Sequence, residues 1–150
     1  MLVFVEGIDK TGKDTLVKYI NELTGYKHCV LTRGPISTTA YAYKFKRQYD
    51  DSYIKSLKDS LIIYLTADTE DLNIRFKLTN EPEINKDEDK KLFNNTIKVL
   101  KVKYGLNVKK INTSEYTPYA IAKAIKNYIE EEENNAKKWK YKSIKTKNGH

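Results

Sequence analysis

The sequence predicts an α/β fold in three layers, with about four parallel strands between layers of helices. Short apolar runs alternate with amphipathic stretches along the chain, which is the pattern of β-α-β crossovers. The run SLIIYLTA at 60–67 is almost continuously apolar, as expected for a parallel strand covered on both faces. A loop with two glycines, 7–12, separates the first apolar run, 2–6, from the first amphipathic stretch.

Each element is expected from a local pattern. The strands are expected where apolar or β-branched residues gather, at 2–6, 28–31, 60–67 and 107–114. Ser37 is expected to cap a helix that carries Tyr41, Phe45 and Tyr49 on one face. The other helices are expected at segments with helical spacing or helix-forming composition, 14–23, 69–78, 87–104 and 119–133.

The charge of the chain is concentrated at its C-terminal end. The net charge is +8, but the last fifteen residues contain six lysines and no acid, which leaves +2 for the other 135. We therefore expect one folded domain at 1–133 and a basic tail at 134–150. The tail mixes Lys, Asn, Ser and Thr with little periodicity and is expected to be mostly disordered. Nucleic acid is a candidate partner only for this tail.

Composition excludes several classes of protein. The single cysteine, Cys29, cannot form an intrachain disulfide, and His28 and His150 do not complete a Cys/His metal cage. No apolar run approaches the roughly 18 residues of a membrane span. The start MLVFV is too short for the apolar core of a secretory signal, so a cytoplasmic protein without a membrane partner is expected.

The segment GIDKTGKD, Gly7–Asp14, fits the phosphate-binding pattern G-x-x-x-x-G-K between a strand and a helix. The two glycines let backbone N–H groups point at phosphate oxygens, Lys13 adds a cation, and the helix N-terminus adds a favourable dipole. The segment therefore predicts the fold of P-loop NTPases, with ATP as ligand. The expected ATP-binding residues are Gly7, Ile8, Asp9, Lys10, Thr11, Gly12, Lys13, Asp14 and Thr15.

One residue departs from the pattern. Asp14 stands where a Ser or Thr usually places its hydroxyl on Mg²⁺. A carboxylate about 4 Å from a phosphate charge costs on the order of 4 kcal/mol unless a metal lies between them. Asp14 is therefore a candidate Mg²⁺ ligand, and the alternative is a helix-start residue beside a weak or absent metal site.

Two motifs resemble those of a known family. FVEGIDKTGKDT, at 4–15, resembles the opening of thymidylate kinases, and its GKDT ending looks like the loop of certain phage deoxynucleoside monophosphate kinases. TRGPISTTAY, at 32–41, is similar to the D-R-x-x-x-S-x-x-A-Y segment of thymidylate kinases, with Thr32 in place of the acid. Together with the strand at 60–67 and Arg75, the resemblance covers most of 2–130. It implies a nucleotide kinase domain at 1–133 with a mobile lid at about 69–86.

The resemblance implies a role for each matched residue. Asp9 would contact the sugar of the acceptor, and Lys10 would occupy the place of a catalytic cation. Lys13 would hold the transferred phosphoryl group, Arg33 would clamp the acceptor phosphate, and Arg75 would belong to the lid over ATP. Several cations converging on one point suit phosphoryl transfer, which depends on positioning and charge neutralisation. The expected substrate-binding residues are Glu6, Asp9, Arg33, Ser37 and Tyr41.

Two features of the expected site stay open at the level of sequence. Glu6 could act as a general base, as in deoxynucleoside kinases, or as a structural partner of Arg33, which we favour. Asp14 and Thr32 look like a carboxylate and a hydroxyl exchanged between two positions, and we expect both to bind Mg²⁺.

The acceptor base also stays open. Compared with the thymidylate kinases that it resembles, the chain is short by one strand-helix unit, together with the arginine and the aromatic residue that usually hold the base. Tyr41, Tyr43 and Tyr49 are candidates for a stacking ring, although aromatic residues at helical spacing more often belong to a core.

The expected function is transfer of the ATP γ-phosphoryl group to a deoxynucleoside monophosphate, with dTMP as the leading acceptor and Mg²⁺ as cofactor. The alternatives are a deoxynucleoside kinase, a polynucleotide 5′-kinase that uses the basic tail, and a degenerate nucleotide-binding protein without turnover. A GTPase is disfavoured because NKDE, at 85–88, only nearly matches the guanine-reading pattern N-K-x-D. The expected partners are small nucleotides, and a homodimer is left open.

Overall fold

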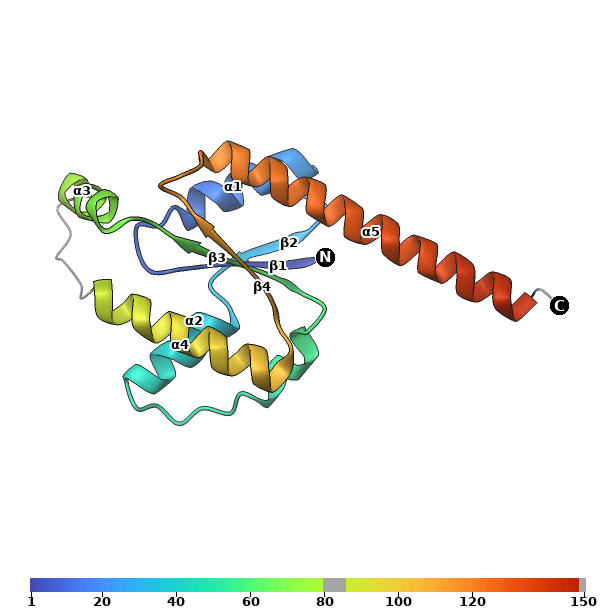
Figure 1. The fold of residues 1–150 in the computed structure, drawn as a ribbon, viewed down its shortest axis with the longest axis horizontal. Coiled ribbons are helices and arrows are strands. Elements are labelled where there is room, and N and C mark those ends of the chain that lie inside the picture. Colours follow the sequence, from blue (N-terminus) through green and yellow to red (C-terminus); the bar gives the residue numbers. More distant parts are fainter. Residues whose placement is uncertain (80–85, 149–150) are drawn as a thin grey trace.

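A sheet of parallel strands forms the centre of the computed structural model, which describes residues 1–79 and 86–148 (Figure 1). Within these residues the sheet has four strands in the order β2-β1-β3-β4. All neighbouring strands run parallel. The strands are β1 (Leu2–Glu6), β2 (Cys29–Thr32), β3 (Leu61–Thr66) and β4 (Asn107–Asn112). The predicted small parallel sheet is confirmed.

The apolar pattern of each strand matches its place in the sheet. β3 is a central strand, and its residues 61–65 are at most 2% exposed. β2 and β4 are edge strands and are more exposed, and β4 is also more polar. In the register of β1 and β3, Val5 pairs with Ile63 and Glu6 with Tyr64. The C-terminal ends of the inner strands therefore lie together, where Gly7 begins the next loop.

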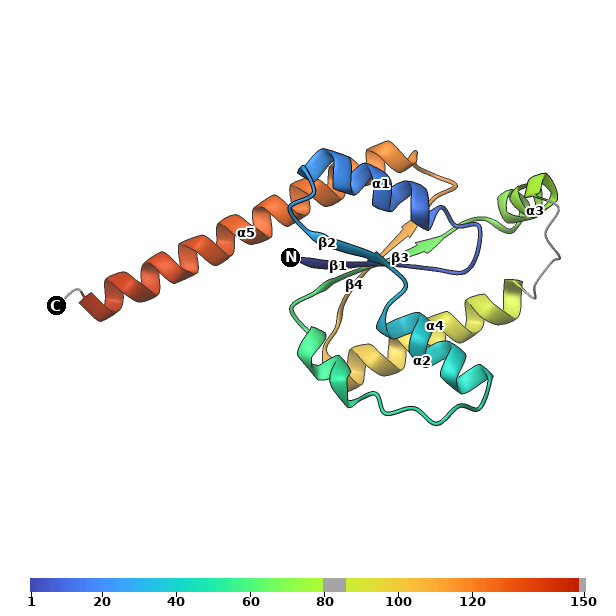
Figure 2. The same cartoon turned by 180° about the vertical axis from the view of Figure 1, so that it is seen from behind.

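Helices cover both faces of the sheet (Figures 1 and 2). α1 (Lys13–Thr24) and α5 (Pro118–Asn148) lie on one face and pack against each other. α2 (Pro35–Lys44) and α4 (Lys86–Tyr104) lie on the other face. α3 (Thr69–Thr79) follows the C-terminal end of β3, and a short 3₁₀ helix spans Ser52–Leu57. Each face has its own core of buried side chains, so the three-layer α/β architecture is confirmed.

The second helix differs from the expectation at both ends. α2 begins at Pro35 after Gly34, so Ser37 is its third residue and not its cap. Its hydroxyl still contributes to the cap, because it donates to the Gly34 carbonyl and accepts from the Gly34 N–H, both at 3.3 Å. The helix ends at Lys44, which leaves Tyr49 in the following connection. Proline suits the first helical turn because its missing N–H has no partner there anyway.

The C-terminal segment is the largest correction to the expected elements. Disorder was expected after Glu133, but α5 continues without a break to Asn148. Its sequence after Pro118 contains no glycine or proline before Gly149 and is rich in Lys, Glu and Ala, which favour helix. The expected lid at 69–86 is α3 in its first part, and 80–85 lie outside the described residues. Within the described ranges, no helix combines the length and hydrophobicity needed to cross a bilayer.

Candidate functional site

The loop at the C-terminal end of β1 has the backbone shape that a phosphate cradle requires. Gly7 has a φ of 152°, and a Cβ there would lie 2.6 Å from the Leu65 carbonyl oxygen. Gly12 has a φ of 92° and precedes the first residue of α1. The Thr11 hydroxyl donates to the Ile8 carbonyl at 2.8 Å and closes the loop on itself. The N-terminus of α1 therefore opens directly into the space in front of the loop.

Lys13 lies inside the loop. Its ammonium donates to the Gly7 carbonyl at 2.7 Å and the Ile8 carbonyl at 3.0 Å. Burial lowers the pKa of Lys13; Arg33 lowers it further, and Asp9 acts in the opposite direction. The two carbonyl groups that accept from the Lys13 ammonium are neutral and compensate its positive charge only in part. An anion in the cavity would therefore interact favourably with this ammonium.

A cavity of about 540 Å³ lies in front of the loop. Its lining combines residues from the loop, the first turn of α1 and the end of β2: Asp9, Lys10, Gly12, Lys13, Asp14, Thr15, Thr32 and Arg33. Arg33 Nη2 lies 3.9 Å from Asp9 Oδ1, and both side chains are substantially exposed. The structure thus brings the two sequence motifs together at one cavity.

Glu6 has a different role from the expected one. Its carboxylate is fully buried and accepts hydrogen bonds from the backbone N–H groups of Gly34 (2.8 Å), Ile36 (2.7 Å) and Ser37 (2.8 Å). It therefore compensates the N-terminus of α2, where unpaired N–H groups and the helix dipole favour an anion. The expected partnership with Arg33 is wrong, because Arg33 pairs with Asp9.

Neither Ser37 nor Tyr41 is in the lining of the cavity in front of the loop. Ser37 is 3% exposed, and its hydroxyl is turned to Gly34. Tyr41 is half-buried and packs edge-on against Phe93, with ring centroids 5.7 Å apart. Burial raises the pKa of Tyr41, Asp89 and Asp9 raise it further, and Arg33 opposes them.

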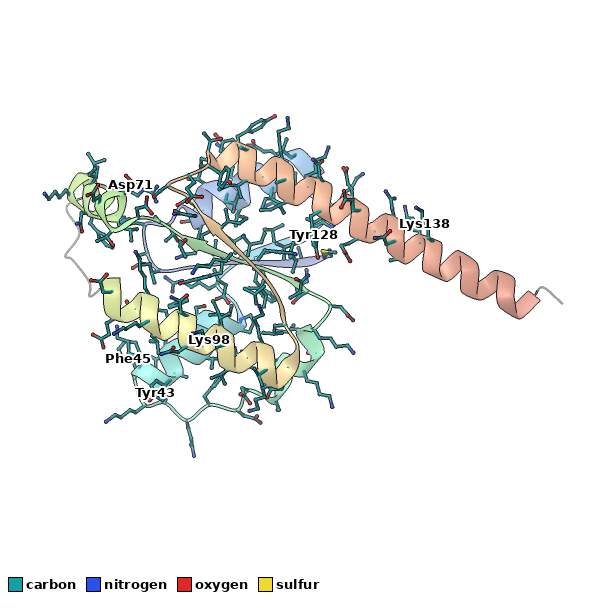
Figure 3. The ribbon with its side chains drawn as sticks, viewed as in Figure 1. Tyr43, Phe45, Asp71, Lys98, Tyr128 and Lys138 are labelled. Atoms are coloured by element: carbon teal, nitrogen blue, oxygen red, sulfur yellow. The ribbon has the colours of Figure 1, made fainter. Side chains whose placement is uncertain are left out.

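The other two candidate stacking rings lie elsewhere. Tyr43 is 79% exposed on α2, and Figure 3 shows it at the lower rim of the molecule with Phe45. Tyr49 accepts a hydrogen bond from Thr39 at 3.1 Å and packs against the ring of Tyr53. None of the three tyrosines is in the lining of the cavity in front of the loop.

Arg75 connects the expected lid to the loop. It lies on α3, and its Nη1 donates to the Lys10 carbonyl at 2.7 Å and to Thr113 Oγ1 at 3.3 Å. A second cavity of about 420 Å³ lies beside it. Its surface is mostly apolar. The lining residues come from the loop, α1, α3, the connection after β4 and the start of α5: Lys10, Thr11, Gly12, Thr15, Leu16, Arg75, Leu78, Thr79, Thr113, Pro118 and Ile121. The two cavities share Lys10, Gly12 and Thr15, so they meet at the loop.

The residues expected to bind a metal lie at the same cavity. Asp14 is in the first turn of α1 and Thr32 is the last residue of β2. No group of three or more His, Cys, Asp or Glu side chains gathers into a metal cage among the described residues. A carboxylate and a hydroxyl beside a phosphate cradle fit Mg²⁺, which keeps several waters and takes other oxygen ligands from a bound substrate.

Sequence patterns did not predict one buried charge near the site. Asp89 is 2% exposed in α4, and Lys44 of α2 donates to its Oδ1 at 2.8 Å. Asp89 falls on the same helical stripe as Phe93, Thr96 and Leu100, so an acid at an apolar position was the available signal. This ion pair joins α2 to α4.

The parallel sheet, its helices on both faces and the glycine loop between β1 and α1 define the class: an α/β protein with the P-loop NTPase-like fold. A solved structure similar to this chain is that of the YorR protein from Bacillus subtilis in complex with phosphorylated GDP. It aligns with a TM-score of 0.73 and 19% identity, over 89% of this chain and 98% of YorR. No protein-family model and no curated protein sequence matches the chain.

Proposed function

We propose that the protein is a nucleotide kinase that transfers the γ-phosphoryl group of ATP to a deoxynucleoside monophosphate. The observation that carries the proposal is the cavity in which Lys13 of the phosphate-binding loop and Arg33 after β2 face one space. Two cations and a helix N-terminus around one space suit the spread negative charge of a phosphoryl group in transfer. The YorR complex supports a nucleotide as the ligand of this fold.

The triphosphate is proposed to lie in the loop of Gly7–Gly12. Lys13 would exchange its two carbonyl partners for phosphate oxygens, which offer it a full opposite charge. The second cavity beside Arg75 has the apolar lining that suits a nucleoside, and it meets the phosphate cradle at Lys10 and Gly12. Arg75 would then close over the donor from α3. Lys10 is the loop residue proposed to act as a further cation.

The acceptor is proposed to lie on the other side of the loop. Arg33 would exchange its long contact with Asp9 for the acceptor phosphate, which its planar guanidinium can bind with two parallel hydrogen bonds. Asp9 would then be available to the sugar hydroxyl. The ring of Tyr41 is the candidate for contact with the base, and dTMP is the acceptor that we propose first.

The reaction needs no general base. An oxygen of the acceptor monophosphate, already ionised at neutral pH, attacks the γ-phosphorus as the bond to the β–γ bridging oxygen breaks and ADP leaves. Mg²⁺, when bound at Asp14 and Thr32, would neutralise charge on the phosphate oxygens. The engagement of Glu6 with three backbone N–H groups argues against a nucleoside kinase, which needs a base to take the proton of a hydroxyl.

A second candidate function is nucleotide binding without turnover. Asp14 in the position of a hydroxyl residue favours it, because its carboxylate lies in the lining of the phosphate cavity. Without a metal between them, the carboxylate and a bound phosphate would repel each other.

ADP release from ATP and Mg²⁺ tests the proposal. The acceptor panel contains the four deoxynucleoside monophosphates, GMP and GDP, the matching nucleosides and a 5′-hydroxyl oligonucleotide. We expect stimulation by a monophosphate, dTMP first, and none in a Lys13→Met variant. Silence across the panel, with ATP binding confirmed by calorimetry, would contradict the kinase proposal and favour nucleotide binding without turnover. Stimulation by a nucleoside or the oligonucleotide would change the acceptor class.

A further inference from the structure

Helix α5 leaves the body of the protein partway along its length. Its first turns pack on the sheet through Ile125 and Ile129, which are 5% and 1% exposed. The Tyr128 hydroxyl accepts a hydrogen bond from Asn107 of β4 at 2.9 Å. Glu133 then lies 3.4 Å from His28 Nε2. Beyond Glu133 the helix extends away from the rest of the protein, as seen from both sides (Figures 1 and 2). Lys138 lies on this extension, away from the sheet and its helices (Figure 3).

A helix in this position needs a source of stability other than its own sequence. A lone polar helix in water is marginal, since most helical stability in proteins comes from packing. Ion pairs one turn apart would help, and Lys126 and Glu130 form one at 3.4 Å. Glu131 and Glu132, however, have no basic residue three or four positions away on either side. Lys138 and Lys140 likewise have no acid at those positions.

The opposite charges of α5 are arranged end to end. An acidic block, Glu130–Glu133, is followed by a basic block of lysines at 137, 138, 140, 142, 145 and 147. Between them lie Asn134, Asn135 and Ala136, which are uncharged. The helix therefore cannot neutralise most of these charges within itself. An antiparallel copy of the same helix would place each block against the opposite one.

We propose that two copies of this protein associate through antiparallel contact of their α5 helices, with a two-fold axis between Asn134 and Asn135. Glu131 and Lys138 are both exposed and lie two turns apart, on the face of the helix that points away from Ile125 and Ile129. With the axis between positions 134 and 135, Glu131 of each copy lies opposite Lys138 of the other. The contact leaves the face of α5 that packs on the body to the body alone.

The same charge order disfavours a nucleic acid as the occupant. A phosphate backbone would be attracted by the basic block but repelled by the acidic block directly before it. A second copy matches both blocks at once. Exposed ion pairs are individually weak and are screened by salt, so the dimer is expected to be weak and sensitive to ionic strength. This inference does not depend on the proposed kinase activity.

Sedimentation equilibrium of the full chain, over a range of protein concentrations, tests the association. We expect dimer at about 0.02 M salt and monomer at about 0.5 M salt. Two double variants, Glu131→Lys with Glu132→Lys and Lys138→Glu with Lys140→Glu, should each raise the dissociation constant by about tenfold or more. Their equimolar mixture should dimerise again, because each extension then carries the charge that the other lacks.

Two controls separate this geometry from general charge effects. Glu22→Lys with Asp59→Lys changes the net charge as much as the acidic double variant but lies on the body, and should leave the dissociation constant unchanged. In a Cys29→Ser background, Asn135→Cys should form a disulfide-linked dimer on mild oxidation, whereas Glu115→Cys should not. Monomer at all concentrations in low salt, or a dimer that tolerates both charge reversals, would overturn the proposal. A monomer that binds a single-stranded oligonucleotide through the lysines alone would identify nucleic acid as the partner.

Discussion

The carboxylate of Glu6, the last residue of β1, lies 2.8 Å from the backbone nitrogen of Gly34 and accepts its hydrogen bond. Gly34 directly follows Arg33, whose φ of 67° turns the chain from β2 into α2. Position 34 also requires glycine, because a Cβ there would lie 2.5 Å from the ring of Phe4. One buried carboxylate therefore links the glycine loop, which starts at Gly7 and is proposed to bind phosphate, to the arginine proposed to bind the acceptor.

The first prediction concerns that link. Glu6→Ala should lower the free energy of unfolding by about 3 kcal/mol, because three buried N–H groups lose a charged partner. Glu6→Gln should lower it less, since the amide carbonyl can still accept from Gly34 and Ser37. Urea unfolding followed by circular dichroism measures both. Equal loss in the two variants would contradict a role in accepting these hydrogen bonds.

The second prediction concerns Lys13. Lys13→Met should lower kcat/KM by about a hundredfold or more, because one cation at the transferred phosphoryl group is lost. The folded state should remain, since the ammonium donates only to two carbonyls of its own loop. Steady-state kinetics and a thermal melt check the two parts. Activity within a few-fold of the unmodified protein would remove Lys13 from the proposed mechanism.

The third prediction separates the two substrates. Arg33→Met should raise the KM for the acceptor monophosphate by about tenfold or more and leave the KM for ATP nearly unchanged. Arg47→Met is the matched control, because Arg47 is exposed and lies over the ring of Phe45, away from the cavity lining. If Arg33→Met instead weakens ATP, the donor and acceptor sides of the loop have been assigned in the wrong order.

The fourth prediction concerns the metal. Asp14 and Thr32 line one cavity from two elements, so a carboxylate and a hydroxyl remain if they are exchanged. Asp14→Thr with Thr32→Asp should retain far more activity than either single change, and should bind Mn²⁺ in a spectroscopic titration better than either. Strictly additive losses would mean that the two residues do not share an ion.

The fifth prediction concerns stability in alkali. Burial in the central strand raises the pKa of Tyr64 to about 12. The unfolded chain releases this proton first, near the ordinary value of 10, so stability is full below about pH 10 and falls as the pH rises toward 12. Tyr64→Phe should make that fall shallower. An unchanged slope of unfolding free energy against pH between 10 and 12 would contradict the assignment.

Local patterns were enough to predict most of the fold. The four strands, the loop at 7–12 and the first helix depend on apolar spacing and on glycines within a few residues of each other. The meeting of Arg33 with the loop was also predictable, because the ends of neighbouring parallel strands lie at one edge of a sheet. The cap of the second helix was predicted three residues too late, at Ser37 instead of Gly34, because Pro35 already starts the helix.

The sequence by itself determined the α/β architecture and the shape of the glycine loop, because both depend on short-range periodicity and on backbone freedom at glycine. The tertiary structure alone decided which groups meet across long separations. Glu6 reaches an N–H group 28 residues away, and Lys44 finds the buried Asp89 at a separation of 45 residues. The extension of α5 to Asn148 was missed for another reason: its helix-forming residues, without glycine or proline, were visible in the sequence but were given less weight than the charge and lack of periodicity. A buried charge must be paired, but its partner comes from a distant part of the chain, so local sequence spacing does not predict which residue it is.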